Sequence, residues 1–155
     1  MSYVSFMEQA LEQARAAMVR GEVPVGAVLV DADGIVIAAD GNRIEEYGDP
    51  AAHAEMLVIR AGVQRFLTPR LVGCDLYVSL EPCPMCAHAI SLARIRRLYF
   101  GASDVKGGGV ENGVRLYTQP TCHHKPEVYG GICDIASSQL LKSFFVSRRG
   151  RNVSA

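Results

Sequence analysis

Two short segments of the chain carry side chains that can bind one metal ion. Cys83 and Cys86 are separated by two residues, so both sulfur atoms can point at the same cation. His53, far upstream, can add a neutral imidazole, and thiolate and imidazole are both good zinc ligands. Three protein ligands, rather than four, are typical of a catalytic zinc that keeps its fourth position for water.

Glu55 follows His53 by two residues. Positions two apart on a helix do not face each other, so Glu55 is not expected to bind the metal beside His53. Its carboxylate is then free to carry protons for a water molecule that the metal activates. We therefore expect one Zn²⁺ per chain, held by His53, Cys83 and Cys86, with Glu55 as the catalytic residue.

The same cysteine pair could instead belong to a redox dithiol or to half of a structural zinc site. Pro82 and Pro84 flank the first cysteine, which is not typical of a redox motif. A structural site needs a fourth cysteine or histidine, and Cys122-His123-His124 is the other cluster that could supply one. Adjacent side chains project in different directions and lack a standard ligand spacing, which disfavours that site.

Hydrophobic periodicity predicts an α/β chain. Strands are expected at residues 25–30, 35–39, 75–80, 97–101 and 127–132. Helices are expected after a Ser5 cap up to Gly21, from Asp49-Pro50 to Gly62, from Pro84 to about Ala93, and from Ser137 or Ser138 through Phe145. The strand at 75–80, the cysteine helix and the strand at 97–101 form a βαβ unit, so these strands should be parallel. The cysteines then lie at the end of the sheet where α/β proteins bind ligands.

The segment from Ala102 to Thr121 reads as a long loop with three consecutive glycines, Gly107 to Gly109. It lacks the Gly-Lys-Ser/Thr ending of a phosphate-binding loop, which argues against a nucleoside triphosphate site. The pattern does not decide between a mobile flap over the pocket and a plain surface loop.

Composition places the chain, residues 1–155, in one domain with a hydrophobic core. No apolar run approaches the roughly 20 residues of a membrane helix, and the N-terminus is not a secretory signal. The five cysteines suggest no disulfide framework, so a cytoplasmic location is expected. Net charge is zero, but basic residues cluster at Arg94 to Arg97 and at Lys142 to Arg151, where a polyanion could dock if the fold joins them.

The His-x-Glu segment and the Pro-Cys-x-x-Cys segment together resemble the cytidine deaminase-like superfamily. Within it, the chain resembles the bacterial tRNA-specific adenosine deaminases from about Phe6 to Arg149. The segments that carry the likeness are Glu22 to Val28, Gly41-Asn42-Arg43, Ala52-His53-Ala54-Glu55, Leu76 to Cys83, Gly101 to Asp104, and Phe144-Phe145 with the basic residues that follow. The resemblance implies a three-layer α/β/α fold around a mixed five-stranded sheet.

The resemblance also implies a function. The family deaminates adenosine to inosine at the wobble position of a tRNA anticodon, commonly that of arginine tRNA, as a homodimer in which both subunits contribute to the RNA site. The residues that it implies for substrate binding are Asn42, Ala54, Leu80, Pro82, Asp104, Lys106, His123 and Phe145. The chain has His123-His124 where the family pattern has Asn-His, which weakens the implied role of His123.

Three other functions are compatible with the sequence. A deaminase of a free base or nucleoside, such as guanine or cytosine, would use the same zinc chemistry. A non-enzymatic partner subunit usually lacks the glutamate, whereas this chain has Glu55. A structural zinc module would require a fourth protein ligand.

Overall fold

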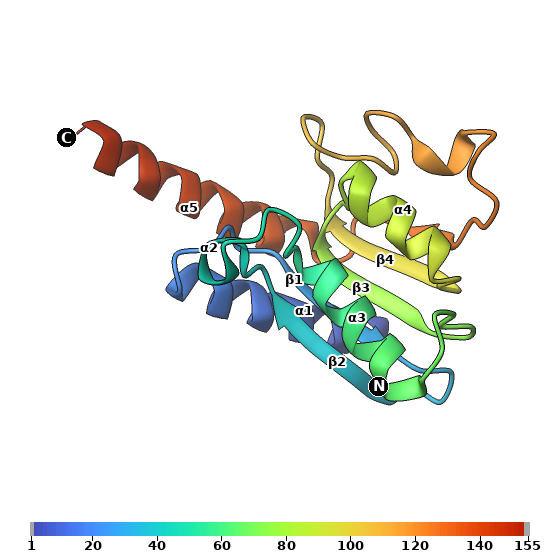
Figure 1. Cartoon of the computed structure of the whole chain (residues 1–155). Coiled ribbons are helices and arrows are strands. Elements are labelled where there is room, and N and C mark those ends of the chain that lie inside the picture. The colour runs from blue at the N-terminus through green and yellow to red at the C-terminus, as the bar shows by residue number, and fades with distance from the viewer. Residues whose placement is uncertain (1, 154–155) are drawn as a thin grey trace.

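Five strands form one mixed sheet in the computed structural model, which describes residues 2–153 and the side chains of residues 2–149 (Figure 1). The strands are β1 (Gly26–Val30), β2 (Val36–Gly41), β3 (Asp75–Leu80), β4 (Arg97–Ala102) and β5 (Glu127–Tyr129), in the spatial order β2-β1-β3-β4-β5. β1 is antiparallel to β2 and β3, whereas β3, β4 and β5 are mutually parallel. The predicted mixed sheet and its parallel βαβ unit are confirmed.

Helices cover both faces of the sheet and complete the predicted three layers (Figure 1). The helices α1 (Tyr3–Val19) and α5 (Asp134–Val153) pack on one face, and α3 (Ala54–Phe66) and α4 (Pro84–Leu92) on the other. Every residue of β1 is buried because this strand lies between the two helical layers. A short helix, α2 (Ile44–Tyr47), and a 3-10 turn at Leu116–Thr118 lie in the connections.

The helix α3 corrects two predicted boundaries. Asp49-Pro50 does not begin it, because the Asp49 side chain accepts a hydrogen bond from the Ala51 N–H and closes a separate turn. Gly62 does not end it, because this glycine lies where α3 touches β1, and a Cβ there would collide with Leu29. The helix continues to Phe66 and stops at Leu67, whose φ is 54°.

The other predicted boundaries are close, with three corrections at element ends. The helix α1 begins at Tyr3, because Ser2 rather than Ser5 accepts the capping hydrogen bond. The strand β5 ends at Tyr129 instead of residue 132. The helix α5 begins at Asp134, before the two serines expected to cap it, and Ser137 instead accepts a hydrogen bond from the Ala102 N–H.

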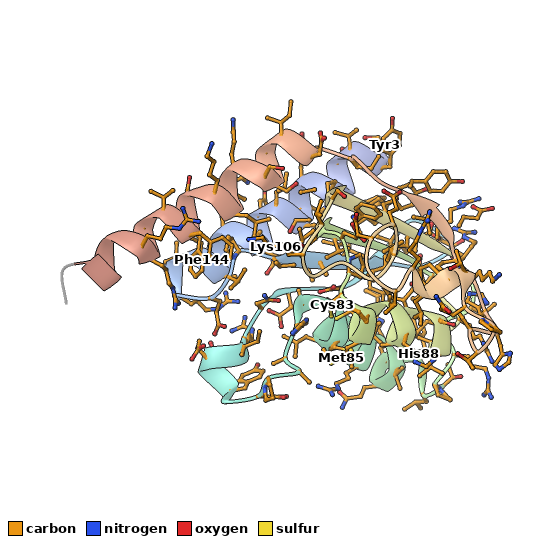
Figure 2. All side chains as sticks on the ribbon, turned by 90° about the horizontal axis from the view of Figure 1, so that it is seen from above. Tyr3, Cys83, Met85, His88, Lys106 and Phe144 are labelled. Carbon is orange, nitrogen blue, oxygen red and sulfur yellow. The ribbon has the colours of Figure 1, made fainter. Side chains whose placement is uncertain are left out.

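A row of tyrosines crosses the sheet on the face that α1 covers. Tyr77, Tyr99 and Tyr129 occupy paired positions on β3, β4 and β5. The rings of Tyr77 and Tyr99 stack with centroids 4.4 Å apart and an angle of 1° between their planes. Tyr3 at the start of α1, labelled in Figure 2, stacks on Tyr99 with centroids 6.3 Å apart. Such aromatic pairs contribute roughly 0.5–1.5 kcal/mol each beyond the area they bury.

The longest helix, α5, has 20 residues and extends well past the sheet (Figure 1). It carries exposed Lys142, Arg148 and Arg149. Between residues 2 and 153, no helix combines the length and the apolar character that crossing a bilayer requires.

Candidate metal centre and active site

Three ligand atoms converge at the starts of two neighbouring helices. His53 is the residue before α3, Cys83 is the residue before α4, and Cys86 lies in the first turn of α4 behind Pro84. Their ligand atoms all lie within 4.8 Å of one another. The Sγ atoms of Cys83 and Cys86 are 3.6 and 3.5 Å from Nδ1 of His53. In the part of the chain that the structure describes, no fourth side chain joins this group.

The spacing of these atoms fits a zinc ion. Zinc bonds of about 2.3 Å to sulfur and about 2.05 Å to nitrogen at a tetrahedral angle separate the two atoms by about 3.6 Å. The observed separations of 3.6 and 3.5 Å match that value without any rearrangement. The donor set of one imidazole and two thiols is also one that zinc prefers. The set therefore suits a zinc site with three protein ligands.

The contacts within this group favour a negative charge on Cys83. The hydrogen bond from the Cys86 thiol lowers the pKa of Cys83, and the contact with His53 adds to that effect. The hydrogen bond between the two cysteines raises the pKa of Cys86, and the burial of Cys86 raises that pKa further. The hydrogen bond to Cys83 raises the pKa of His53. The lowered pKa favours the thiolate form of Cys83, and the thiolate is the form that binds zinc.

Glu55 lies in the first turn of α3, beside the metal ligands and in the same pocket. Its side chain is 3% exposed, and this burial raises its pKa from 4.5 to about 6. The pocket has a volume of about 240 Å³. The predicted residues that line it are Asn42, His53, Glu55, Leu80, Cys83 and Asp104. A carboxyl with a pKa near neutrality can both accept and donate a proton.

Asn42 and Ala54 are linked by a hydrogen bond inside this site. The Oδ1 atom of buried Asn42 accepts from the backbone N–H of Ala54 at 2.9 Å. The NH₂ group of Asn42 is therefore the part that can donate to a molecule in the pocket. Ala54 and Pro82 are both buried and do not line the pocket, and the Pro82 carbonyl accepts from Gly109. These two residues support the wall rather than form its surface.

A wider groove adjoins the pocket and shares Val23, Leu80, Asp104 and Gly107 with it. It has a volume of about 660 Å³ and continues past Lys106 to Phe145 and Arg149 on α5. Cys83, which lines the pocket, and Lys106, which lines the groove, are labelled in Figure 2. The structure thus brings Asp104, Lys106 and Phe145 to one continuous surface that leads into the candidate active site.

His123 lies away from this surface. Its neighbours fasten the segment to the far end of α4, because Cys122 contacts Ser91 and the His124 ring contacts the Ile95 carbonyl at 2.7 Å. The two candidate cysteine ligands, Cys83 and Cys86, are at the start of the same helix. Within one chain, His123 therefore lines neither the pocket nor the groove.

The two predicted basic clusters do not come together. Arg96 and Arg97 lie beside the first residues of β3 and β4, where Asp75 and Glu127 bind their guanidinium groups. The pocket lies at the other end of these strands, about 16 Å away for five residues of strand. Arg149 on α5, in contrast, lines the groove. The side chain of Arg151 lies outside the described part of the chain.

The sequence did not single out the residues that hold the 42–48 segment in place. Buried Glu22 accepts hydrogen bonds from the backbone N–H groups of Glu45 and Glu46 at 3.0 and 2.9 Å, at the start of α2. Arg20 donates to the Asn42 carbonyl at 3.0 Å. A glutamate beside the first apolar strand is the only sequence signal for this arrangement, and it does not reveal the partner.

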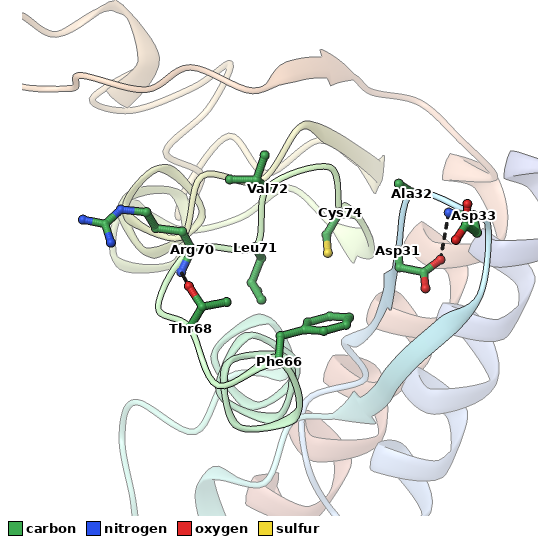
Figure 3. Close-up of a pocket in the computed structure, with 9 residues that line it drawn as sticks. All are labelled: Asp31, Ala32, Asp33, Phe66, Thr68, Arg70, Leu71, Val72 and Cys74. Carbon is green, nitrogen blue, oxygen red and sulfur yellow. Dashed lines mark hydrogen bonds between the residues drawn. The ribbon is translucent and has the colours of Figure 1, made fainter.

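A second hollow, of about 320 Å³, lies at the opposite end of the sheet (Figure 3). Two of its polar side chains bond within their own turns: Asp31 accepts from the Asp33 N–H and Thr68 accepts from the Arg70 N–H (Figure 3). Cys74 is its only thiol, and burial raises the pKa of that thiol. The hollow therefore offers no ligand set like that of the zinc site.

Fold and site together define a zinc-binding deaminase. The family model for the cytidine and deoxycytidylate deaminase zinc-binding region matches residues 1–102, which include His53, Glu55, Cys83 and Cys86. The match covers the sheet from β1 to β4 together with both helices that carry the ligands.

Comparison with similar proteins identifies the subfamily within these deaminases. The tRNA-specific adenosine deaminase of Agrobacterium fabrum is 58% identical over 144 residues, which cover 93% of this chain and 94% of that protein. The tRNA-specific adenosine deaminase of Bacillus subtilis is 41% identical over 150 residues, 97% of this chain and 92% of that protein. A structure from a study of A-to-I editing by tRNA wobble-position deaminases is 59% identical, with a TM-score of 0.87 over 88% of this chain and 99% of that chain. The chain belongs to the family of tRNA-specific adenosine deaminases.

Proposed function

We propose that this protein hydrolyses adenosine to inosine at the wobble position of a tRNA anticodon, with arginine tRNA as the main substrate. The observation that carries the proposal is the convergence of His53, Cys83 and Cys86 within 4.8 Å, beside buried Glu55. The named relatives, which edit tRNA, supply the substrate.

Zinc held by His53, Cys83 and Cys86 would supply a Lewis acid that makes a water molecule acidic near neutral pH. The Glu55 carboxylate accepts a proton from the attacking water. It then protonates the adenine ring nitrogen next to C6, while the water oxygen bonds to C6. Glu55 next takes the remaining proton of that oxygen and passes it to the amino group, which leaves as ammonia. Water is consumed and ammonia released, so Glu55 ends the cycle in its starting state. The raised pKa of Glu55 supports this exchange.

The pocket walls would hold the target adenine base once it has turned out of the anticodon loop. The Asn42 NH₂ group can donate to an acceptor nitrogen of adenine, because its Oδ1 is already bonded to Ala54. Leu80 presents an apolar surface against which the base can pack. Bases of an anticodon loop are unpaired, so moving one into the pocket costs little.

The adjoining groove would bind the neighbouring nucleotides. Phe145 offers an aromatic surface for base stacking, while Lys106 and Arg149 can face phosphates. We further propose a cytoplasmic homodimer whose subunits both contribute to the RNA site. His123 can contact the anticodon only in such a dimer, because it lies away from the pocket of its own chain.

A free-base deaminase is the second candidate function. The guanine deaminase of Bacillus subtilis is 31% identical to this chain, with a TM-score of 0.66 over 83% of this chain and 85% of that chain. The same pocket could admit guanine, since its volume of about 240 Å³ suits a single base. The groove beyond Leu80 favours a polynucleotide, because a free base would leave it unused.

One experiment separates the two functions. Purified zinc-loaded protein is incubated with arginine tRNA carrying an ACG anticodon, with adenosine, with guanine and with cytosine, and ammonia release is measured. The tRNA is then sequenced for inosine at the wobble position. Inosine at that position alone supports the proposal, whereas ammonia released only from a free base or nucleoside would replace it with the alternative.

A further inference from the structure

A buried carboxylate holds the long loop that borders the pocket. Glu81, at the end of β3, is 2% exposed. Its Oε1 accepts from Ser103 Oγ, the Asp104 N–H and Asn112 Nδ2 at 3.3, 3.0 and 2.7 Å. Its Oε2 accepts from the N–H groups of Val110, Glu111 and Asn112 at 3.2, 3.0 and 3.0 Å. All six donors belong to residues 103–112, which here are called the Glu81 loop.

The glycines of this loop serve close packing. A Cβ on Gly108 would collide with Glu81 Oε2, and a Cβ on Gly109 would lie 2.6 Å from the backbone nitrogen of Pro84. The Gly109 N–H also donates to the Pro82 carbonyl at 2.8 Å. Further along, the Tyr117 hydroxyl donates to the Ala87 carbonyl at 2.9 Å. These contacts favour a fixed wall over the mobile flap that three consecutive glycines suggest.

The Glu81 loop supplies the boundary between the pocket and the groove. Asp104 and Gly107 line both, Lys106 lines the groove, and Glu81 itself lies at the edge of the pocket. Asp104 is tied to Glu81 through its own backbone N–H, and its Oδ1 accepts from the Gly107 N–H at 2.9 Å. The Glu81 carboxylate therefore helps to fix the positions of Asp104, Lys106 and Gly107.

We propose that Glu81 is a positioning residue that fixes this wall and thereby sets the affinity of the enzyme for the nucleotides that flank the target base. The proposal rests on the proposed tRNA-editing function. The structure shows no hydrogen bond between the Glu81 side chain and His53, Cys83 or Cys86. Zinc binding should therefore survive the loss of Glu81, while RNA binding should weaken.

Glu81→Gln is the direct test, because the amide has the same shape but turns an NH₂ group toward N–H donors. We expect KM for arginine tRNA to rise at least tenfold and kcat per zinc-loaded molecule to stay within threefold of the natural protein. Zinc content and the absorption spectrum of the cobalt-substituted protein should not change. The backbone amides of Asp104, Val110, Glu111 and Asn112 should exchange with deuterium at least tenfold faster.

Asp75→Asn is the matched control. Asp75 is another buried carboxylate, 7% exposed and bound by Arg96, but at the opposite end of β3. Its loss should lower the melting temperature without changing KM or the exchange of the Glu81 loop. If Asp75→Asn raises KM as much as Glu81→Gln does, the effect is general destabilisation and the proposal is overturned.

Gly108→Ala keeps the proposal testable if Glu81→Gln does not fold, because its Cβ would collide with Glu81 Oε2 and with the Asp104 carbonyl and so separate the Glu81 loop from the carboxylate. The expected result is the same rise in KM with unchanged zinc content. Fast exchange in the Glu81 loop with an unchanged KM would overturn the role in substrate affinity. Slow exchange in both variants would show that Glu81 does not hold the loop. Absence of tRNA editing by the natural protein would refute the proposed function instead. The deuterium-exchange measurement would still show whether Glu81 holds the loop in place.

Discussion

Replacing Glu55 should remove activity and at the same time stabilise the metal-free protein. A proton-transferring group contributes roughly 10²–10⁴-fold to rate, so Glu55→Gln should lower kcat by that factor while zinc binding persists. Burial raises the pKa of Glu55 from 4.5 to about 6, so holding the carboxylate charged in the folded state costs about 2 kcal/mol. The neutral amide removes that cost and should raise the melting temperature of the chelator-treated protein by roughly 4–8 °C.

The stability gained by Glu55→Gln should depend on pH. A carboxyl whose pKa is higher in the folded state than in the unfolded state reduces stability fully only above the folded value, near 6. Below 4.5 it is protonated in both states, and the penalty disappears. The advantage of Glu55→Gln should therefore be complete at pH 8 and vanish by pH 4.

Thermal unfolding of chelator-treated protein at several pH values measures the stability, and inosine formation with zinc-loaded protein measures the rate. Glu12→Gln, on the exposed side of α1, is the control and should change neither quantity. A Glu55→Gln variant that edits tRNA at the natural rate would refute the proton shuttle. A variant that is less stable than the natural protein at pH 8 would refute the assignment of a charge cost to this pocket.

Three further predictions concern the metal, the core and the RNA surface. Cys83→Ala and His53→Ala should lose both zinc, measured by mass spectrometry, and activity, whereas Cys133→Ala should keep both; retained stoichiometric zinc would contradict the ligand set. Ser137→Ala leaves the buried Ala102 N–H without an acceptor and should destabilise the protein by about 1–3 kcal/mol in urea unfolding, whereas exposed Ser138→Ala should have little effect. Arg149→Ala should weaken tRNA binding and reduce the salt-dependence slope by about 1, whereas Arg97→Ala, paired with Glu127, should not; equal effects would contradict the groove.

Sequence reasoning recovered the features that local patterns encode. Period-two and period-3.6 patterns located all five strands and the two ligand-bearing helices, and the Cys83-x-x-Cys86 spacing indicated the metal site. Boundaries were wrong where tertiary contacts decided them. Gly62 reads as a helix end, but it is a glycine because α3 touches Leu29.

Other features of the site could not be predicted, because they depend on contacts between residues that are distant in the sequence. Nothing near Glu81 announces that six donors from residues 103–112 will surround its carboxylate. The three glycines suggest motion, whereas their contacts indicate close packing. Likewise, Arg94 to Arg97 read as a basic cluster, but Asp75 and Glu127 neutralise it at the end of the sheet far from the pocket.

The stacked tyrosines of β3 and β4 give the protein an internal optical reporter. The chain has no tryptophan, so tyrosine dominates its near-ultraviolet spectrum. Tyr77 and Tyr99, parallel and 4.4 Å apart, should couple strongly enough to produce a circular dichroism signal of their own. Because these rings lie on the face of the sheet that α1 covers, and the zinc ligands belong to the other face, the signal should vanish when the sheet unfolds and persist when only the metal is withdrawn.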